Sequence, residues 1–208
     1  MYDEEFWNRR YAIGGYLYGT EPNSFLAEHC SLLSGPVLSL SEGEGRNAVF
    51  LASGGLEVLG VDISMIALEK AKKLAKSRGV EIKTMVTDLA TFKPEENHYG
   101  SVVSISAHLP SAVRNRLYPL IERSLKPDGI IILEAYSENQ LLRDTGGPKD
   151  ADMLMTVDKM HREFPNFEPI LLCEVEREVS EGEGHTGTAS VVQFIARKKP
   201  NKALQLTG

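Results

Sequence analysis

One segment near the N-terminus constrains the fold of this chain more than any other. An apolar run at residues 36–40 leads into a glycine-rich turn at 41–45, and a helical stretch follows at 46–53. Glycine has no Cβ, so the backbone N–H groups of such a turn and the helix N-terminus can come close to a ligand. The same pattern also fits a tight strand-to-helix turn that binds nothing. The segment alone therefore predicts a ligand crevice without excluding a purely structural turn.

The strand-to-helix order repeats along the first two thirds of the chain. This alternation requires a parallel sheet with helices on both faces. Ser64 is a good N-cap for the second helix, which ends before Gly79, and Pro119 is expected to kink the third. A turn is expected at 126–129. The predicted strands are 36–40, 57–61, 80–86, 101–106 and 130–133, and the third helix is 112–125.

The last third of the chain departs from this repeat. Two strand-like runs, 169–179 and 188–197, follow a helical segment near 158–164. Residues 180–187 between them are too few for a parallel crossover, which needs a dozen or more residues, so the two runs are expected to form an antiparallel hairpin. The predicted fold is a doubly wound α/β fold with a mostly parallel seven-stranded sheet and a C-terminal antiparallel hairpin.

Composition narrows the class of protein. The chain has 208 residues, of which 42% are hydrophobic and 25% charged, with a net charge of −6. Disorder is excluded, and the acidic balance disfavours nucleic-acid binding. No apolar run reaches the roughly 20 residues that cross a bilayer, and the N-terminus is acidic, so no membrane association and a cytoplasmic location are expected. Cys30 and Cys173 lack metal-ligand spacing, so neither a metal site nor a disulfide framework is predicted.

Two carboxylates follow predicted strands on the same edge of the sheet. Asp62 lies 19 residues beyond Gly43, where it can accept hydrogen bonds from both hydroxyls of a ribose. Asp88 can accept from an adenine amino group, or it is simply an N-cap or turn residue. A dinucleotide site would need a third glycine where Ala48 stands, although some such sites tolerate alanine. Glu44 would repel a pyrophosphate but is harmless beside a sulfonium or an ammonium.

These residues resemble the class I S-adenosylmethionine-dependent methyltransferases, and within them the small tellurite-resistance-type subgroup related to thiopurine-type methyltransferases. The usual first motif of the family is acid-x-Gly-x-Gly-x-Gly. This chain has Ser39 for the acid and Ser41 for the first glycine. The likeness covers nearly the whole chain and rests on 6–11, 16–26, 42–52, 60–64, 88–89, 125–129 and 193–198.

The resemblance implies roles for the cofactor site. Gly43 and Gly45 would line the methionine part of S-adenosylmethionine, with Glu42 and the loop carbonyls taking the ammonium that Ser39 cannot hold. Residues 1–28 would form an arm that folds over the ligand as a lid, or that only covers apolar surface. Its candidates for stacking on the ligand or holding its carboxylate are Trp7, Arg10 and Tyr18. The remaining predicted cofactor contacts are Asp62 at the ribose, Asp88 and Leu89 at the adenine, and Ser106 beside the sulfonium. Arg46, Asn47 and Ile63 are further predicted cofactor contacts.

The loops after the fourth, fifth and sixth strands face the same crevice, because ligands bind beyond the carboxyl ends of parallel strands. His108, Tyr18 and His185 are the candidates for catalysis, although either histidine can equally be a solvated surface residue. The same loops offer Tyr136, Ser137, Gln140, Glu183 and Gly184 to the acceptor.

The sequence thus predicts direct methyl transfer to a small-molecule acceptor, with a thiol or a reduced chalcogen among the candidates. The alternatives are a non-catalytic module that binds an adenosyl ligand and, third, a nicotinamide-dependent oxidoreductase. Residues 1–198 are expected to form one domain, 199–208 a flexible tail, and the protein a monomer or a homodimer.

Overall fold

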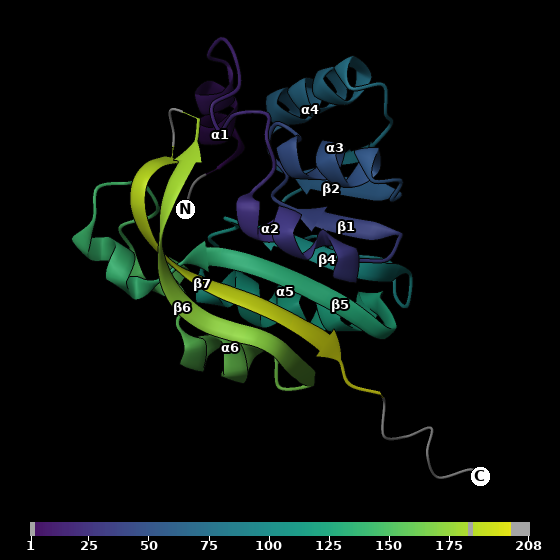
Figure 1. Ribbon diagram of the computed structural model, residues 1–208, viewed down its shortest axis with the longest axis vertical. Helices are drawn as coiled ribbons and strands as arrows, with labels where there is room; N and C mark the ends of the chain where they lie inside the picture. The colour runs from purple at the N-terminus through teal and green to yellow at the C-terminus, as the bar shows by residue number, and fades with distance from the viewer. Residues whose placement is uncertain (1–2, 183–184, 201–208) are drawn as a thin grey trace.

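Seven strands form one twisted sheet in the computed structural model, which describes residues 3–182 and 185–200 (Figure 1). Their order across the sheet is β3-β2-β1-β4-β5-β7-β6. This is the mostly parallel, doubly wound sheet with a C-terminal antiparallel hairpin that the sequence predicts. The strands are β1 (Val37–Leu40), β2 (Val58–Asp62), β3 (Lys83–Val86), β4 (Tyr99–Ile105), β5 (Leu125–Tyr136), β6 (Phe167–Glu181) and β7 (His185–Lys198).

The parallel strands bring their carboxyl ends to one edge of the sheet. β1 lies in the middle and pairs in parallel with both β2 and β4. All four of its residues are buried, because helices cover both faces of the sheet at this point. The ends of β1, β2 and β4 therefore lie side by side, and the loops that leave them can share one ligand.

β6 and β7 form the predicted antiparallel hairpin, and both are longer than the sequence pattern indicates. Their register runs from Phe167 opposite Lys198 to Glu181 opposite His185. β7 also pairs antiparallel with β5, so the chain returns through the sheet between β5 and β6. The end of β6 at Glu181 and the start of β7 at His185 consequently extend beyond the carboxyl end of β5 at Tyr136.

Two apolar clusters fill the space between the sheet and its helices. α2 (Ser24–His29) and α3 (Arg46–Ser53) pack on one face through Phe25, Leu26, Ala48 and Leu51. α5 (Ser111–Ser124) and α6 (Val157–Glu163) pack on the other through residues such as Leu117 and Phe164. Figure 1 shows α3 and α4 (Met65–Ser77) side by side above β1 and β2. Short 3₁₀ turns at Cys30–Leu32, Glu138–Leu142 and Ala151–Met153 complete the elements.

Several boundaries differ from those that the sequence predicts, and two of the differences have a clear local cause. β3 begins at Lys83 instead of residue 80, because the backbone N–H of Val80 closes the end of α4 by donating to the carbonyl of Ala75. The turn predicted at 126–129 lies inside β5, where the pairing with β4 skips from Leu125 to Ile130. Asp128 has a φ of 60° there, so these residues bulge out of the strand as a turn would.

The N-terminal arm carries a helix that docks on α4. α1 (Glu4–Tyr11) is capped by Asp3, whose carboxylate accepts from the N–H of Phe6 at 2.8 Å. Ser64 donates a hydrogen bond to Asn8 at 2.7 Å, which joins α1 to the start of α4. Among residues 3–182 and 185–200, no helix is both long and apolar enough to cross a membrane. The predicted tail falls largely on 201–208, outside the described residues.

Candidate functional site

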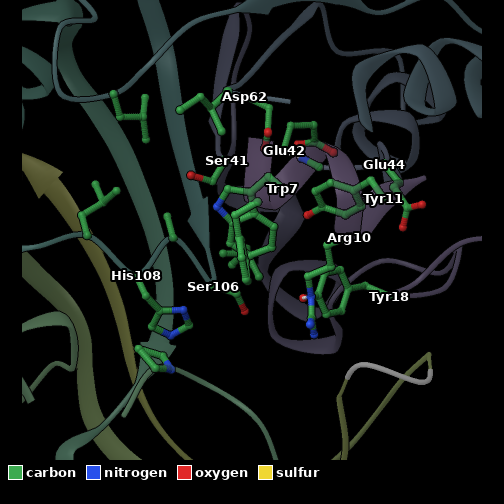
Figure 2. A pocket seen from close by; sticks show the side chains of 18 of the residues that line it. Trp7, Arg10, Tyr11, Tyr18, Ser41, Glu42, Glu44, Asp62, Ser106 and His108 are labelled. Carbon is green, nitrogen blue, oxygen red and sulfur yellow. Dashed lines mark hydrogen bonds between the residues drawn. The ribbon is translucent and has the colours of Figure 1, made fainter. Parts of the chain in front are cut away.

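A cavity of about 320 Å³ opens at the carboxyl ends of β1, β2 and β4, within the size range of small-ligand sites. Its walls come from the arm, the turn after β1, the loops after β2, β3 and β4, and a glycine-rich segment near residue 147 (Figure 2). The lining includes all the predicted cofactor residues except Gly45, namely Glu42, Gly43, Arg46, Asn47, Asp62, Ile63, Asp88, Leu89, Ser106, Trp7 and Arg10, with Tyr18 and His108.

The turn after β1 has the backbone that its glycines permit. Gly43 and Gly45 have φ values of 63° and 95°, which side chains with a Cβ rarely adopt. A Cβ at Gly45 would lie 2.6 Å from the Cβ of Ala71, so α3 and α4 pack directly against this glycine. Ser41 stands where the family motif has its first glycine and keeps a left-handed φ of 49°. The turn therefore retains the expected shape despite this departure.

Asp62 holds the turn in place from the end of β2. Its carboxylate accepts hydrogen bonds from the N–H groups of Gly43 at 2.9 Å and Ser64 at 2.8 Å. The residue is 6% exposed, and burial raises the pKa of its carboxyl above the usual value although the backbone N–H groups act in the opposite direction. Asp62 thus combines an anchoring role with a place on the cavity wall, where its oxygens have lone pairs left for a ligand. Its contact with a ribose stays a prediction.

Glu42 turns its carboxylate toward Ser39, the residue that replaces the acid of the family motif. One oxygen accepts from the hydroxyl of Ser39 and the other from the N–H of Ala48 at 2.9 Å. Burial is the main cause that raises the pKa of Glu42 to about 7. The side chain crosses β2 at Gly60, where a Cβ would lie 2.9 Å from its Cγ. The carboxylate of Glu42 therefore lies beside Ser39, although Glu42 comes three residues later in the chain.

Glu44 has a different role from the one that the sequence predicts. It lines the cavity, but its carboxylate pairs with Lys70 at 2.7 Å and accepts from the N–H of Leu17 at 2.7 Å. Lys70 also donates to the carbonyls of Ile13 and Gly15. Because Lys70 compensates its charge, Glu44 repels a pyrophosphate less than the sequence alone indicates. Through these contacts, Glu44 links the N-terminal arm to α4.

Arg46 and Asn47 begin α3 beneath the hairpin tip. Asn47 accepts from the N–H of Asn23 at 3.0 Å, which holds the end of the arm. Arg46 donates from Nη2 to Glu181 at 2.7 Å and belongs to a buried network whose other members are Asn23, Glu134, Arg177 and Gln193. The network joins the arm, α3, β5 and the hairpin on one side of the cavity.

Asp88 and Leu89 form the far wall, after β3. Asp88 is exposed and accepts from the N–H of Ala90 at 2.8 Å, so it acts as the turn residue that the sequence offers as an alternative. Both residues also line the cavity. An adenine contact of Asp88 is compatible with this geometry and stays a prediction.

The arm supplies an aromatic wall. Trp7 stacks on Tyr11 with ring centroids 5.6 Å apart, and Tyr11 meets Tyr18 edge to face. Arg10 donates from Nε to the hydroxyl of Tyr18 at 3.2 Å and lies over its ring. Figure 2 shows Trp7 below Glu42 and Asp62 in the view, and Arg10 beside Tyr18. Tyr11 was not among the predicted site residues, although its spacing of four residues from Trp7 puts both on one face of α1.

His108 faces the cavity from the loop after β4, and its ring stacks on Tyr136 at 5.0 Å. Its Nε2 accepts from the backbone N–H of Tyr136 at 3.0 Å. A nitrogen that accepts carries no proton, so the neutral ring has its proton on Nδ1. Ser106, with a left-handed φ of 57°, turns the chain between β4 and His108.

The cavity wall near Tyr136 contains further residues that were not predicted from the sequence. Gly147 leaves room for the ring of Tyr136, since a Cβ there would lie 2.5 Å from it. Pro148 and Met153 line the same wall. The Gly-Gly-Pro run at 146–148 was visible in the sequence, but nothing local showed that it would fold over the strand ends. Among the described residues, no group of His, Cys, Asp and Glu side chains is arranged to hold a metal ion.

Three expected acceptor contacts, Tyr136, Ser137 and Gln140, do not line the cavity. Ser137 pairs with Ser190 at 2.8 Å, and Gln140 donates to Thr145 at 2.7 Å. The backbone of His185 begins β7, while its side chain, together with Glu183 and Gly184, lies outside the described part of the structure. The catalytic role proposed for His185 therefore stays a prediction.

Comparisons with known proteins agree with this geometry. Residues 37–129 match the family model of the methyltransferase domain. A curated relative, the 2-heptyl-1-hydroxyquinolin-4(1H)-one methyltransferase of Mycobacteroides abscessus, is 26% identical over 117 residues, which are 55% of this chain and 52% of the relative. The chain thus spans about half the length of that relative.

Solved structures extend the likeness to the whole sheet. The N-methyltransferase NodS from Bradyrhizobium japonicum, solved with S-adenosyl-L-homocysteine, superposes with a TM-score of 0.70 at 14% identity, over 96% of this chain and 100% of that one. TehB from Haemophilus influenzae has a TM-score of 0.70 at 16% identity, over 94% and 67%. At these identities the structural likeness shows the fold.

Proposed function

We propose that this chain, a member of the class I S-adenosylmethionine-dependent methyltransferases, transfers the methyl group of S-adenosylmethionine to a small acceptor that arrives as an anion. A thiol or a reduced chalcogen is the acceptor class that we favour. The observation that carries the proposal is the hydrogen bond from the backbone N–H of Tyr136 to Nε2 of His108.

The residues present fit the cofactor. Two buried carboxylates, Glu42 and Asp62, lie on the cavity wall without a salt bridge to any described side chain, and a ligand with a sulfonium and an ammonium would supply the cation. Arg46 offers a buried nitrogen, Nη1, that no described group pairs with, and the ligand has a carboxylate. Asp62 would hold the ribose, and Asp88 with Leu89 would border the adenine.

Bound S-adenosylmethionine supplies a methyl group on a cationic sulfur that is open to direct attack. The protein then has to align the attacking atom with the leaving sulfur and to exclude water. Trp7 and Tyr18 from the arm, with Pro148 and Met153 from the opposite wall, enclose the space for this alignment. None of these side chains has to form a covalent bond to the substrate.

The hydrogen bond that Nε2 of His108 accepts limits how well this residue can act as a general base. Nε2 can take a proton from a substrate only by giving up the hydrogen bond from Tyr136. An acceptor that ionises by itself needs no such base, and a thiolate or a reduced chalcogen anion meets this condition. Arg10, a cationic side chain on the arm side of the cavity, supports an anionic acceptor electrostatically.

A flat, acidic N-hydroxy heterocycle is a second candidate acceptor. The curated relative is named for a hydroxyquinolinone, and the aromatic and apolar walls made by Trp7, Tyr18, Leu109 and Met153 suit a planar ring. Its hydroxyl is more acidic than an alcohol, so this acceptor also requires little help from a base.

An assay with a panel of acceptors tests the proposal. The purified protein is incubated with S-adenosylmethionine and, in turn, alkyl and aryl thiols, selenite or tellurite with a reductant, and an N-hydroxyquinolinone, and the methylated product and S-adenosylhomocysteine are measured by mass spectrometry. We expect turnover with at least one acceptor that ionises, with a rate that rises with pH along the ionisation of that acceptor. Binding of the cofactor without turnover on any acceptor would favour the non-catalytic module, and turnover only on neutral amines or alcohols would refute the anionic acceptor.

A further inference from the structure

Arg114 on α5 lies directly behind the part of the cavity wall that the proposed function gives to the acceptor. This acceptor wall is formed by Leu109, Pro110, Val113 and Met153. The side chain of Arg114 is 2% exposed and does not line the cavity, although its neighbour Val113 does. Arg114 therefore cannot touch a bound acceptor, and any influence on the reaction must pass through the residues that it holds.

The guanidinium of Arg114 joins three segments that are distant in sequence. Its Nη1 donates to the backbone carbonyl of Leu109 and, at 2.6 Å, to that of Asp152. Nε and Nη2 donate to the carboxylate of Glu163 on α6, at 2.9 and 3.1 Å. A guanidinium is planar and presents its donors in fixed directions, so these partners are held at fixed positions relative to one another. Because Asp152 directly precedes Met153, Arg114 sets the separation between Leu109 and Met153.

The side chain of Asp152 ties the same segment to α5 a second time. Its Oδ2 accepts from the backbone N–H of Ser111, the first residue of α5, at 2.8 Å. Asp152 is exposed, so this hydrogen bond lies at the surface, whereas Arg114 lies in the interior. The segment before Met153 is thus fastened by one buried contact and one exposed contact, and the exposed contact can be removed without opening the core.

Arg116, on the same helix, makes the corresponding contacts with the loop after β3, which borders the proposed adenine site. It donates to the backbone carbonyls of Leu89, Thr91 and Phe92, with the shortest distance of 2.8 Å to Thr91. Positions two residues apart on a helix point about 200° apart, so the two arginines face different loops. Leu89 lines the cavity. α5 therefore carries one arginine behind each side of the cavity.

We infer that Arg114 is a positioning residue for the methyl acceptor: it holds Leu109 and Met153 at the separation at which both contact the acceptor, without touching the acceptor itself. This inference rests on the proposed function, because it takes this wall as the acceptor side. The charge of Arg114 is balanced by Glu163, so its effect on the acceptor is an effect of geometry and not of charge.

Steady-state kinetics of two matched variants test the inference, with the thiol, chalcogen or N-hydroxyquinolinone that the unaltered protein methylates. Lysine keeps the charge but lacks the planar fork that reaches three partners. Arg114→Lys should raise KM for the acceptor about fivefold or more and leave the Kd of S-adenosylhomocysteine within about twofold. Arg116→Lys should weaken S-adenosylhomocysteine about fivefold or more and leave KM for the acceptor, at saturating cofactor, within about twofold. Arg123→Lys, at an exposed position of α5 outside the cavity wall, is the control and should change neither quantity.

The split between KM and kcat distinguishes positioning from a general loss of structure. A structural defect alone reduces the folded fraction, which lowers the apparent kcat and leaves KM unchanged. A lower kcat with an unchanged KM in Arg114→Lys would therefore overturn the inference, and so would equal losses of cofactor affinity in Arg114→Lys and Arg116→Lys. An unaltered protein that methylates none of these acceptors would instead overturn the proposed function, and the acceptor role of Arg114 with it.

Asp152→Ala keeps the inference testable if Arg114→Lys does not fold. This variant removes the exposed hydrogen bond to Ser111 and leaves Arg114 and Glu163 in place. KM for the acceptor should rise about threefold, while the Kd of S-adenosylhomocysteine stays within about twofold. An unchanged KM in Asp152→Ala would then overturn the inference.

Discussion

The two halves of the cavity are built in different ways. The half assigned to the cofactor comes from residues 41–89, where successive strands end at one edge and backbone N–H groups fix each carboxylate. The half assigned to the acceptor is assembled from α1, the loop at 106–110 and the segment at 146–153, which are distant in sequence. The first half carries the buried charged residues Glu42, Asp62 and Arg46, whereas the second is mostly aromatic and apolar, with Arg10 as its cation. We therefore expect changes in the first half to alter cofactor binding and changes in the second half to alter the choice of acceptor.

The largest effect is expected at the turn of the cofactor half. Gly45→Ala places a Cβ against Ala71 and keeps a positive φ, so it should lower the free energy of unfolding by about 2–4 kcal/mol. Gly55→Ala is the control, since Gly55 also has a positive φ but faces open space, and it should cost about 1 kcal/mol. Chemical denaturation of both variants measures the difference. Equal losses would mean that the contact between α3 and α4 at Gly45 contributes nothing.

Asp62→Ala comes next and acts on cofactor affinity. We expect a loss of about 1.5–3 kcal/mol in the binding of S-adenosylhomocysteine, the range for hydrogen bonds to a charged group. Asp88→Ala should cost less, because Asp88 is exposed and caps its own turn. Calorimetry compares the two variants. Tight binding by Asp62→Ala would refute the ribose contact.

The sequence was enough to predict that the residues of the cofactor half lie at one edge of the sheet, because this information is local. The spacing from Gly43 to Asp62 follows from one strand-turn-helix-strand unit, and the register of a parallel sheet puts both at the same edge. Pro148, Met153 and Tyr11 could not be placed in this way, since their positions depend on how distant segments pack. The ion pair of Glu44 could not be predicted for the same reason, because its partner Lys70 lies 26 residues later, on α4.

The buried carboxyl group of Glu42 makes the stability of the free protein depend on pH. Its pKa is raised from 4.5 to about 7, so between these pH values the folded protein binds a proton that the unfolded chain has lost. Stability is therefore expected to fall as pH rises from about 4.5 to 7 and to level off above. Glu42→Gln should remove this dependence and stabilise the free protein by about 1–3 kcal/mol at pH 8, with little change at pH 4. Melting curves at both pH values check this, and a variant less stable at pH 8 would contradict it.

Ser39→Asp, introduced together with Glu42→Gln, tests whether a carboxylate at position 39 can replace that of Glu42 in cofactor binding. The double variant returns the acid to the position that the family motif gives it, and it should recover at least half of the affinity for S-adenosylhomocysteine, in free energy, that Glu42→Gln loses. Ser39→Asn in the same background is the uncharged control. Equal affinities of the two double variants would show that the position of the carboxylate, and not its presence, decides the binding.

The smallest effect on binding is expected in the acceptor half. His108→Ala should leave cofactor affinity within about twofold, roughly 0.4 kcal/mol, while it lowers turnover, because His108 supports the wall beside Tyr136. His98→Ala is a control at a histidine outside the cavity. Loss of cofactor binding in His108→Ala would place this residue in the cofactor half, and unchanged turnover would remove it from the site.

A structure of the complex with S-adenosylhomocysteine tests the division of the cavity most directly. We expect the ribose hydroxyls within hydrogen-bond distance of Asp62, the adenine beside Asp88 and Leu89, and the space beside His108 left open for the acceptor. A ligand whose ribose lies away from Asp62, or whose adenine fills the space beside His108, would contradict it.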